Sequence, residues 1–399
     1  MAEIAAVPAN GFSVATTFAG AGGSSLGYRM AGFRVLWANE FVAAAHATYE
    51  ANKSPATIVD SRDIRSIEPA EILAAINLAV GELDILDGSP PCASFSMAGK
   101  RSRDWGKIKA YSDRAQRTDD LFGEFVRLVA GLMPKVFVAE NVSGLVKGVA
   151  KGYFLRTLAA FKAAGYKVEA RLLDAQWLGV PQARQRLIFQ GVRADLGVAP
   201  AFPKPLGYRY SVRDALPWIA QLEEGKGYNS RPFYSADRPS QTILAERSFK
   251  AISTAKGRHS IDMPAPTVLT HGREHTNSEL MVESETDISR FAIGAEWDKL
   301  RPGEKSARYF QLQKPVLAMP CPTLTFGAGA LSCAGVVHPT QKRRFSIAEL
   351  KRICAFPDDF VLTGTYTQQW ERLGRAVPPV MMAKIAAAIR DNVLEGARL

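Results

Sequence analysis

Cysteine is scarce in this chain, and the few cysteines present form no recognisable pattern. None of the 4 cysteines among 399 residues belongs to a CxxC pair; they are Cys92, Cys321, Cys333 and Cys354. The sequence therefore signals neither a disulfide framework nor a regular zinc site. Although His271 and His275 precede two of these cysteines, their spacing fits no common zinc motif, and we expect no metal.

Long hydrophobic runs are also missing. No apolar run reaches the roughly 18 to 20 residues needed to cross a bilayer, so we expect no membrane association. The N-terminus has no basic segment followed by an apolar core, and we therefore expect a cytoplasmic protein associated with the nucleoid. Hydrophobic residues make up 47% of the chain and aromatic residues 9%, which excludes wholesale disorder.

Acidic residues are too few to balance the basic ones. The chain has 50 Lys and Arg against 39 Asp and Glu, which gives a net charge of +11. This balance suits a polyanionic partner, because each neutralised phosphate releases counterions and so adds affinity. A plain basic enzyme would have the same balance, so composition alone leaves both interpretations open.

The chain is too long for one ordinary core, so we expect two domains or one domain with an insertion. Residues 1–11 are small and polar, and we expect a flexible tail there. From Ser13 to Gln190 short apolar runs alternate with helical patterns, which predicts an α/β fold with a parallel sheet covered on both faces. The expected strands lie at 12–20, 34–40, 83–88, 135–142, 166–175 and 184–192, and the expected helices at 22–33, 41–53, 121–133 and 153–165.

Residues 193–337 lose this alternation. A Pro-x-x-Thr phrase followed by aliphatic residues recurs there, which favours an irregular, β-rich lobe. Helical patterns return at 346–357 and 378–395, with apolar spacing suited to packing on the first domain. We therefore expect one domain formed by residues 12–192 and 338–399, with the lobe as an insertion.

A glycine-rich turn, "FAGAGG" at 18–23, joins the first expected strand to the first helix. Glycines there let a ligand approach the backbone, and the helix N-terminus attracts an anionic group. Glu40 ends the second strand, where a carboxylate commonly binds ribose hydroxyls, and Asp63 could accept from an adenine amino group. These features predict a nucleotide-like ligand, although a plain tight turn or a nicotinamide dehydrogenase would also have such a turn.

A cysteine follows two prolines in "GSPPCASFS", directly after an apolar strand. A lone cysteine is more often a small buried hydrophobe, but a backbone fixed by proline suits a nucleophile. Glu140 in "AENV" and Arg186 in "QARQR" also lie at strand ends. A thiolate that adds to C6 of cytosine, a protonated carboxyl group at N3 and a guanidinium at O2 would together activate C5 toward a transferred carbon. Burial favours the protonated form of such a carboxyl group.

With these residues the sequence resembles the cytosine-C5 DNA methyltransferases over nearly its whole length. The resemblance rests, in the family's order, on "FAGAGG", "NE", "RDI", "GSPPCASFS", "AENV", "QARQR", "RRFSIAELKRICAFPDDF" and "GRAVPP". It implies a Rossmann-like S-adenosylmethionine-dependent domain, a target-recognition lobe at 193–337 and a cytosine turned out of double-stranded DNA. It also implies Cys92 as nucleophile, Glu140 at N3 and Arg186 at O2, with Arg184 in support.

The resemblance extends to residues that would contact the two substrates. The expected donor site consists of Phe18 against the adenine, Glu40 on the ribose and Asp63 near the adenine amino group, with Gly20, Gly22, Gly23, Ile64, Pro90, Arg375 and Ala376. Residues 94–114 are similar to a loop that closes on DNA. The expected DNA contacts are Ser94, Lys100, Arg101, Arg103, Arg247, Lys250 and Arg273. We expect a monomer, with a restriction nuclease as a possible companion.

The sequence departs from the family pattern at three positions. Thr16 replaces an acid before the glycine turn, Ala93 replaces a glutamine after the nucleophile, and Arg375 replaces asparagine in the last signature. A guanidinium beside a cationic sulfonium needs an anion. Carboxy-S-adenosylmethionine would supply one, and the product would then be 5-carboxymethylcytosine. Alternatively, Arg375 pairs with the ordinary donor's own carboxylate or with a DNA phosphate.

Two further alternatives remain at this stage. A tRNA cytosine-5 methyltransferase would use the same chemistry and fold, but the size of the lobe favours duplex DNA. A catalytically inactive DNA-binding subunit would be expected to lack Cys92, Glu140 or Arg186, and this chain has all three.

Overall fold

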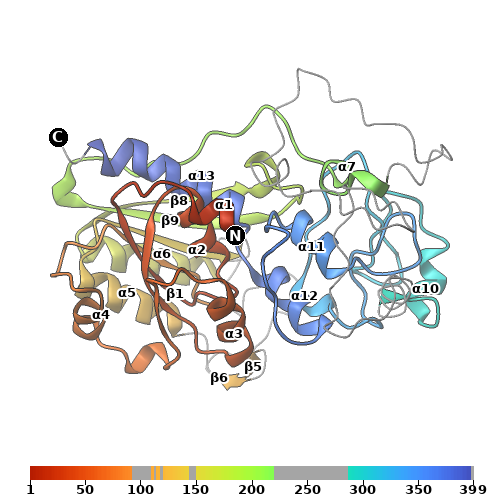
Figure 1. The fold of residues 1–399 in the computed structure, drawn as a ribbon, viewed down its shortest axis with the longest axis horizontal. Helices are drawn as coiled ribbons and strands as arrows, with labels where there is room; N and C mark the ends of the chain where they lie inside the picture. Colours follow the sequence, from red (N-terminus) through yellow and green to blue (C-terminus); the bar gives the residue numbers. More distant parts are fainter. Residues whose placement is uncertain (92–108, 112–113, 117–119, 143–149, 220–285, 397–399) are drawn as a thin grey trace, which may run out of the picture.

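A seven-stranded sheet forms the centre of the larger part of the molecule (Figure 1). The computed structural model describes residues 1–91, 109–111, 114–116, 120–142, 150–219 and 286–396. The strand order is β3-β2-β1-β4-β7-β9-β8. The strands are β1 (Ser13–Thr17), β2 (Arg34–Asn39), β3 (Ile58–Asp60), β4 (Ile85–Gly88), β7 (Val136–Val142), β8 (Tyr166–Asp174) and β9 (Gln185–Arg193); β5 (Lys109–Tyr111) and β6 (Arg114–Gln116) pair separately. The predicted Rossmann-like α/β architecture is confirmed.

The direction of β9 determines where the site forms. Strands β3, β2, β1, β4 and β7 are parallel, whereas β9 runs antiparallel to both β7 and β8. The start of β9 therefore lies beside the carboxyl end of β7, where Val142 pairs with Arg186. This edge is also where β1 and β4 end, so residues far apart in the sequence meet there.

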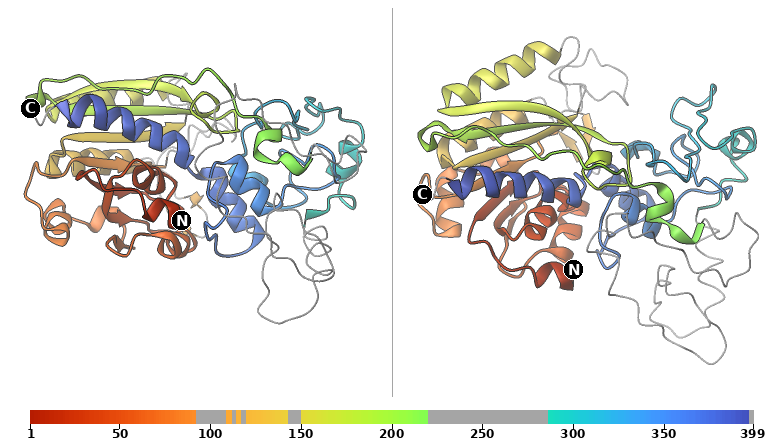
Figure 2. Two further views of the ribbon diagram at one scale, coloured as in Figure 1. Left: turned by 45° about the horizontal axis from the view of Figure 1, so that its top comes forward. Right: turned by 90° about the horizontal axis from the view of Figure 1, so that it is seen from above.

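Helices cover both faces of the sheet (Figures 1 and 2). One face packs on α2 (Gly23–Met30) and α13 (Pro379–Ile389), and this core contains Val14, Ile85 and Met381. The opposite face carries Ala15 and Leu86, because side chains alternate along a strand. The helices there are α4 (Pro69–Ile76), α5 (Leu121–Leu132) and α6 (Ala150–Ala163), while α3 (Ala43–Asn52) follows β2. Burial of both faces explains the nearly continuous apolar strands.

Most of the described part of the lobe lies at one end of the sheet domain (Figure 2), while residues such as Leu196 and Phe202 pack against the core of the sheet. Its described part, 193–219 and 286–337, contains the short helices α7 (Val212–Ala215) and α10 (Ala292–Trp297), and no named strand beyond the last residue of β9. Isolated bridges such as Gln182 to Cys321 connect it instead, so the expected β-rich character is not found in this part. The phrase at 319–325 is rich in proline, which removes the backbone donors that a strand needs.

The apolar packing divides the chain differently from the predicted boundaries. Helices α11 (Ile347–Ile353) and α12 (Tyr366–Arg375) share a buried cluster with lobe residues such as Leu216 and Leu324, and the return to the sheet comes at α13. The expected tail instead begins with the short helix α1 (Ala2–Ala5), because Ile4 is buried in the same cluster as the lobe. Within the described residues, no helix is long and apolar enough to cross a membrane.

Candidate active site

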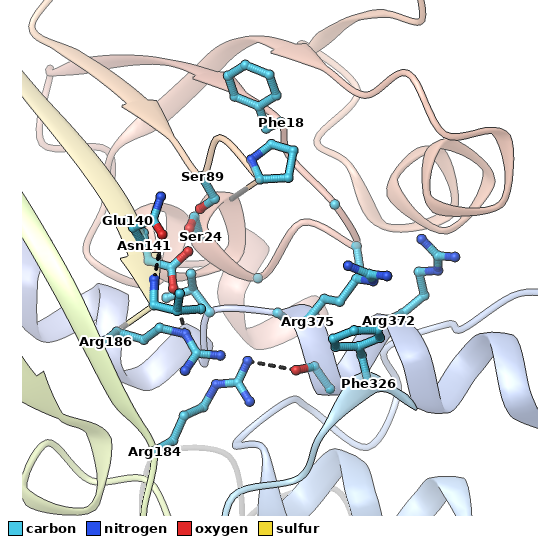
Figure 3. Close-up of a pocket in the computed structure, with 18 of the residues that line it drawn as sticks. Phe18, Ser24, Ser89, Glu140, Asn141, Arg184, Arg186, Phe326, Arg372 and Arg375 are labelled. Carbon is cyan, nitrogen blue, oxygen red and sulfur yellow. Dashed lines mark hydrogen bonds and ion pairs between the residues drawn. The ribbon is translucent and has the colours of Figure 1, made fainter. Parts of the chain in front are cut away.

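A cavity of about 900 Å³ opens where β1, β4 and β7 end and β9 begins (Figure 3). One wall contains the glycine turn and Glu40, and another contains Glu140 and Arg186. The lobe and the last signature close it from the other side through Phe326 and Arg375. The volume is at the upper end of the range for small-molecule pockets, so the cavity has room for more than one small ligand.

The glycine turn has the conformation that its sequence requires. Gly20 and Gly22 have φ values of 57° and 89°, a region that side chains disfavour, and Phe18 itself adopts a φ of 53°. A Cβ atom on Gly23 would lie 2.2 Å from the carbonyl oxygen of Val377. The turn therefore packs directly against the last signature, and all three glycines named in the sequence are explained by geometry.

Glu40 holds the glycine turn in place while it lines the cavity. Its Oε2 accepts a hydrogen bond from the backbone N–H of Gly20 at 2.7 Å, and its Oε1 accepts one from Val42 at 2.7 Å. Burial raises the pKa of Glu40 above its ordinary value. Because each carboxylate oxygen has a second lone pair, this group can also accept from a ligand hydroxyl.

Asp63 lines the same cavity beside the buried Ile64, but it is not a free acceptor. Its Oδ2 lies 3.0 Å from Nη1 of Arg65, and Arg65 also pairs with Asp120 at 2.8 Å. The Asp63 carboxylate also caps the short helix at Ile64–Ser66. An adenine amino group would therefore share Asp63 with an arginine.

Glu140 and Arg186 form an ion pair in the cavity wall. Oε1 of Glu140 lies 2.6 Å from Nε of Arg186, and Glu140 is 8% exposed. The two side chains meet because β7 and β9 pair with Val142 opposite Arg186, which places positions 140 and 186 diagonally on one face of the sheet. The structure thus brings together two of the four expected catalytic residues.

Cys92 lies outside the described residues, but the two residues before it in the sequence are described. Pro90 and Pro91 line the cavity, and the side-chain amide of Asn141 donates to the carbonyl oxygen of Pro90 at 3.3 Å. This bond ties the segment before Cys92 to the strand that carries Glu140. Asn141 was not among the residues expected from the sequence.

Arg184 connects the two parts of the molecule. It is buried, and its guanidinium donates to the carbonyl oxygens of Leu324 at 3.2 Å and Gly374 at 2.8 Å (Figure 3). Burial lowers its pKa to about 9, so it remains charged at neutral pH. Arg184 therefore links the lobe to the last signature and to the strand that carries Arg186.

Arg375 finds its partners within the protein. Its Nε lies 2.8 Å from Oε1 of Glu371, and its guanidinium carbon lies 4.1 Å from the centre of the Phe326 ring. The side chain is 22% exposed and lines the cavity together with Ala376. The sequence pointed to a donor carboxylate or a DNA phosphate as its anion, and in the structure Glu371 supplies one. Glu371 stands four residues earlier on α12, a spacing that was visible in the sequence.

The sequence also missed two charged residues of the cavity. Arg372 is buried and lies 3.3 Å from Glu371, and Asp87 is buried at the carboxyl end of β4. Both line the cavity. For Asp87 the available signal was an acid within the apolar strand "ILDG", since an acid is buried only where it has a partner or a function.

The expected DNA contacts lie outside the described residues; they are Ser94, Lys100, Arg101, Arg103, Arg247, Lys250 and Arg273. On the described rim of the cavity, the ring of Phe310 is 71% exposed and lies 3.9 Å from Nζ of Lys305. The described residues contain no cluster of His, Cys, Asp and Glu that could hold a metal ion.

Comparisons with known proteins agree with this arrangement. The C-5 cytosine-specific DNA methylase family matches residues 12–391. The Type II methyltransferase M.XorII from Xanthomonas oryzae pv. oryzae is 31% identical over 381 residues, 93% of this chain and 83% of the relative. M1.HphI from Haemophilus parahaemolyticus is 31% identical over 374 residues, 93% and 85% of the two chains. The solved structure of an E. coli prophage-encoded DNA modification methyltransferase has the same fold, with a TM-score of 0.63 at 21% identity over 96% of this chain and 99% of that one.

Proposed function

This chain belongs to the C-5 cytosine-specific DNA methylase family, and we propose that it transfers a methyl group from S-adenosylmethionine to C5 of a cytosine turned out of duplex DNA. The observation that carries the proposal is the 2.6 Å pair of Glu140 and Arg186, placed in the same cavity as the glycine turn and Glu40. A base and a donor bound there would lie next to each other. This adjacency is what a direct transfer between them requires.

The described residues fit S-adenosylmethionine as the donor. Phe18 offers an aromatic ring to the adenine, and Glu40 has free lone pairs for the ribose hydroxyls although it already braces the turn. Asp63 and Ile64 line the same wall, which supports the proposal that they contact the adenine. When bound, the donor supplies an electrophilic methyl group.

The protein's own residues then activate the cytosine. The Cys92 thiolate forms a bond to C6, and Glu140, whose Oε1 pairs with Arg186, donates a proton from its other oxygen to N3. One N–H of Arg186 faces Glu140 and another donates to the carbonyl oxygen of Gln185, which leaves donors for O2 of the base. C5 then takes the methyl group. The proton on C5 passes to water, N3 returns its proton to Glu140, and the C6–S bond breaks, which restores the ring and the Cys92 thiolate.

We further propose that the DNA product serves a Type II modification system. Both relatives described above carry the name Type II methyltransferase, and a net charge of +11 suits binding to DNA phosphates. We propose that the enzyme acts as a monomer, that the lobe reads the target sequence and that a restriction nuclease of the same specificity is its companion. A transfer RNA substrate is the alternative, and parallel reactions with duplex DNA and tRNA separate the two.

A second candidate donor is carboxy-S-adenosylmethionine. The observation that favours it is the position of Arg375 in the cavity wall, where the family signature has asparagine. Its pairing with Glu371 at 2.8 Å weakens the case, because the guanidinium already has an anion. We therefore propose methyl transfer as the main activity.

One experiment tests both donors. Duplex DNA is incubated with purified enzyme and either donor, and the modified nucleosides are identified by mass spectrometry. We expect 5-methylcytosine from S-adenosylmethionine. If Arg375→Asn leaves the ratio of the two products unchanged, Arg375 does not select the donor.

A further inference from the structure

The carboxylate of Asp87 lies in the cavity wall, and the proposed mechanism does not use it. Asp87 is 1% exposed. Its Oδ2 accepts a hydrogen bond from the hydroxyl of Thr16 at 3.1 Å, and its Oδ1 accepts one from the hydroxyl of Tyr28 at 3.2 Å. Thr16 pairs with Asp87 in register across β1 and β4. The acid that is missing at position 16 is therefore present on the neighbouring strand, within hydrogen-bond distance of that position.

Asp87 has neutral partners where a buried acid usually has a cation. Among the described residues no Lys, Arg or His pairs with it, and the other groups around it are Ser24 on α2 and the acid Glu140 on β7. Asp84, three residues earlier and directly before β4, pairs with Nζ of Lys135 at 2.8 Å. A buried carboxylate without a counter-charge is costly, so its retention points to a cation that arrives with a ligand.

The electrostatic surroundings agree with this geometry. Burial is the main cause that raises the pKa of Asp87 to about 7, and the nearby Glu140 adds to the effect. A cation bound beside Asp87 would favour the charged form and release a proton near neutral pH.

We propose that Asp87 binds the positive charge in the methionine part of the donor. This inference rests on the proposed function, because it takes the ligand to be S-adenosylmethionine, which carries a sulfonium and an ammonium group. Thr16 and Tyr28 hold the carboxylate in position through their hydroxyl groups. Its partners Thr16 and Tyr28 lie on the strand and the helix that the glycine turn joins, so Asp87 faces the donor side of the cavity rather than the base edge held by Arg186.

The test measures the affinity of the full-length protein for S-adenosylmethionine and for S-adenosylhomocysteine by calorimetry. The isosteric Asp87→Asn should weaken binding of S-adenosylmethionine by about 10- to 100-fold, as expected for loss of a hydrogen bond to a charged group. If the ammonium is the bound group, S-adenosylhomocysteine loses as much; if the sulfonium is bound, its affinity is unchanged. Equal affinity of wild type and variant for S-adenosylmethionine would overturn the inference.

Two controls keep the test informative. Asp84→Asn changes a buried acid directly before the same strand that already has its cation, so it should leave donor affinity unchanged. If Asp87→Asn does not fold, the wild type is titrated with S-adenosylmethionine at pH 7 in two buffers of different ionisation enthalpy. Proton release is expected, and its absence would overturn the inference. A wild type that binds no donor at all would contradict the proposed function instead.

Discussion

Two substitutions of Glu140 should separate its chemical role from its structural role. Glu140→Gln removes the proton donor but keeps an oxygen that can accept from Nε of Arg186, whereas Glu140→Ala removes both. General acid catalysis contributes about 10²- to 10⁴-fold, so Glu140→Gln should slow methyl transfer by that factor, equivalent to about 3 to 5 kcal/mol. Its free energy of unfolding should fall by less than that of Glu140→Ala, because the amide removes the negative charge beside Arg186 but keeps an oxygen within reach of Nε.

Glu140→Ala should instead lose stability as well as activity. Its partner Arg186 would remain in the cavity wall without a counter-charge, and leaving one member of a buried pair alone costs about 3 to 5 kcal/mol. The two side chains are 10% and 11% exposed, so solvent screens this effect only weakly.

The assay combines single-turnover transfer to duplex DNA with urea unfolding. Labelled S-adenosylmethionine gives the rate of the chemical step, and the unfolding curves give the free energy in water. Donor affinity should be unchanged in both variants, because the donor contacts lie elsewhere in the cavity. A Glu140→Gln rate within tenfold of the wild type, or a Glu140→Ala protein as stable as the wild type, would refute the reasoning.

Three further predictions follow from single contacts. Burial raises the pKa of Asp87 to about 7, so this group binds more protons in the folded protein than in the unfolded chain between about pH 4 and 7. Its contribution should therefore lower stability by up to about 4 kcal/mol as pH rises through that window, and urea unfolding of Asp87→Asn at several pH values should show a slope smaller by that amount. Gly23→Ala should weaken donor binding and lower the melting temperature, because its Cβ would lie 2.2 Å from the Val377 carbonyl oxygen. In the control Gly123→Ala the added Cβ has no atom within 4 Å, so donor affinity and melting temperature should stay unchanged. Phe310→Ala should weaken binding to duplex DNA in a fluorescence titration while calorimetry shows unchanged donor affinity, since the exposed ring lies at the rim of the cavity; equal DNA affinity would contradict a role for this ring.

The sequence predicted the sheet domain well because its signals are local. Apolar runs bounded by glycine, such as 83–88, marked buried strands, and the capping box of Ser346 and Glu349 begins α11 at the start of the predicted helix. The meeting of Glu140 with Arg186 was also predicted, but it depends on the antiparallel direction of β9, which no local pattern gives. The prediction that Glu140 and Arg186 meet therefore came from the family resemblance.

What the sequence could not predict depends on contacts between distant segments. Asp87 was overlooked because its hydroxyl partners come from β1 and α2. The helix predicted at 346–357, α11, packs with the lobe rather than the sheet, because an amphipathic pattern does not reveal which surface a helix covers. The partner of Arg375 could have been predicted from the sequence, because Glu371 lies four residues earlier, one helical turn away.

The central claim is that this protein makes 5-methylcytosine through a covalent bond from Cys92. Duplex DNA that has been incubated with S-adenosylmethionine and either wild type or Cys92→Ser is digested to nucleosides, which are identified by mass spectrometry. The account predicts 5-methylcytosine from the wild type and none from the variant. Methylation of an exocyclic amino group, or equal 5-methylcytosine from the two proteins, would contradict it.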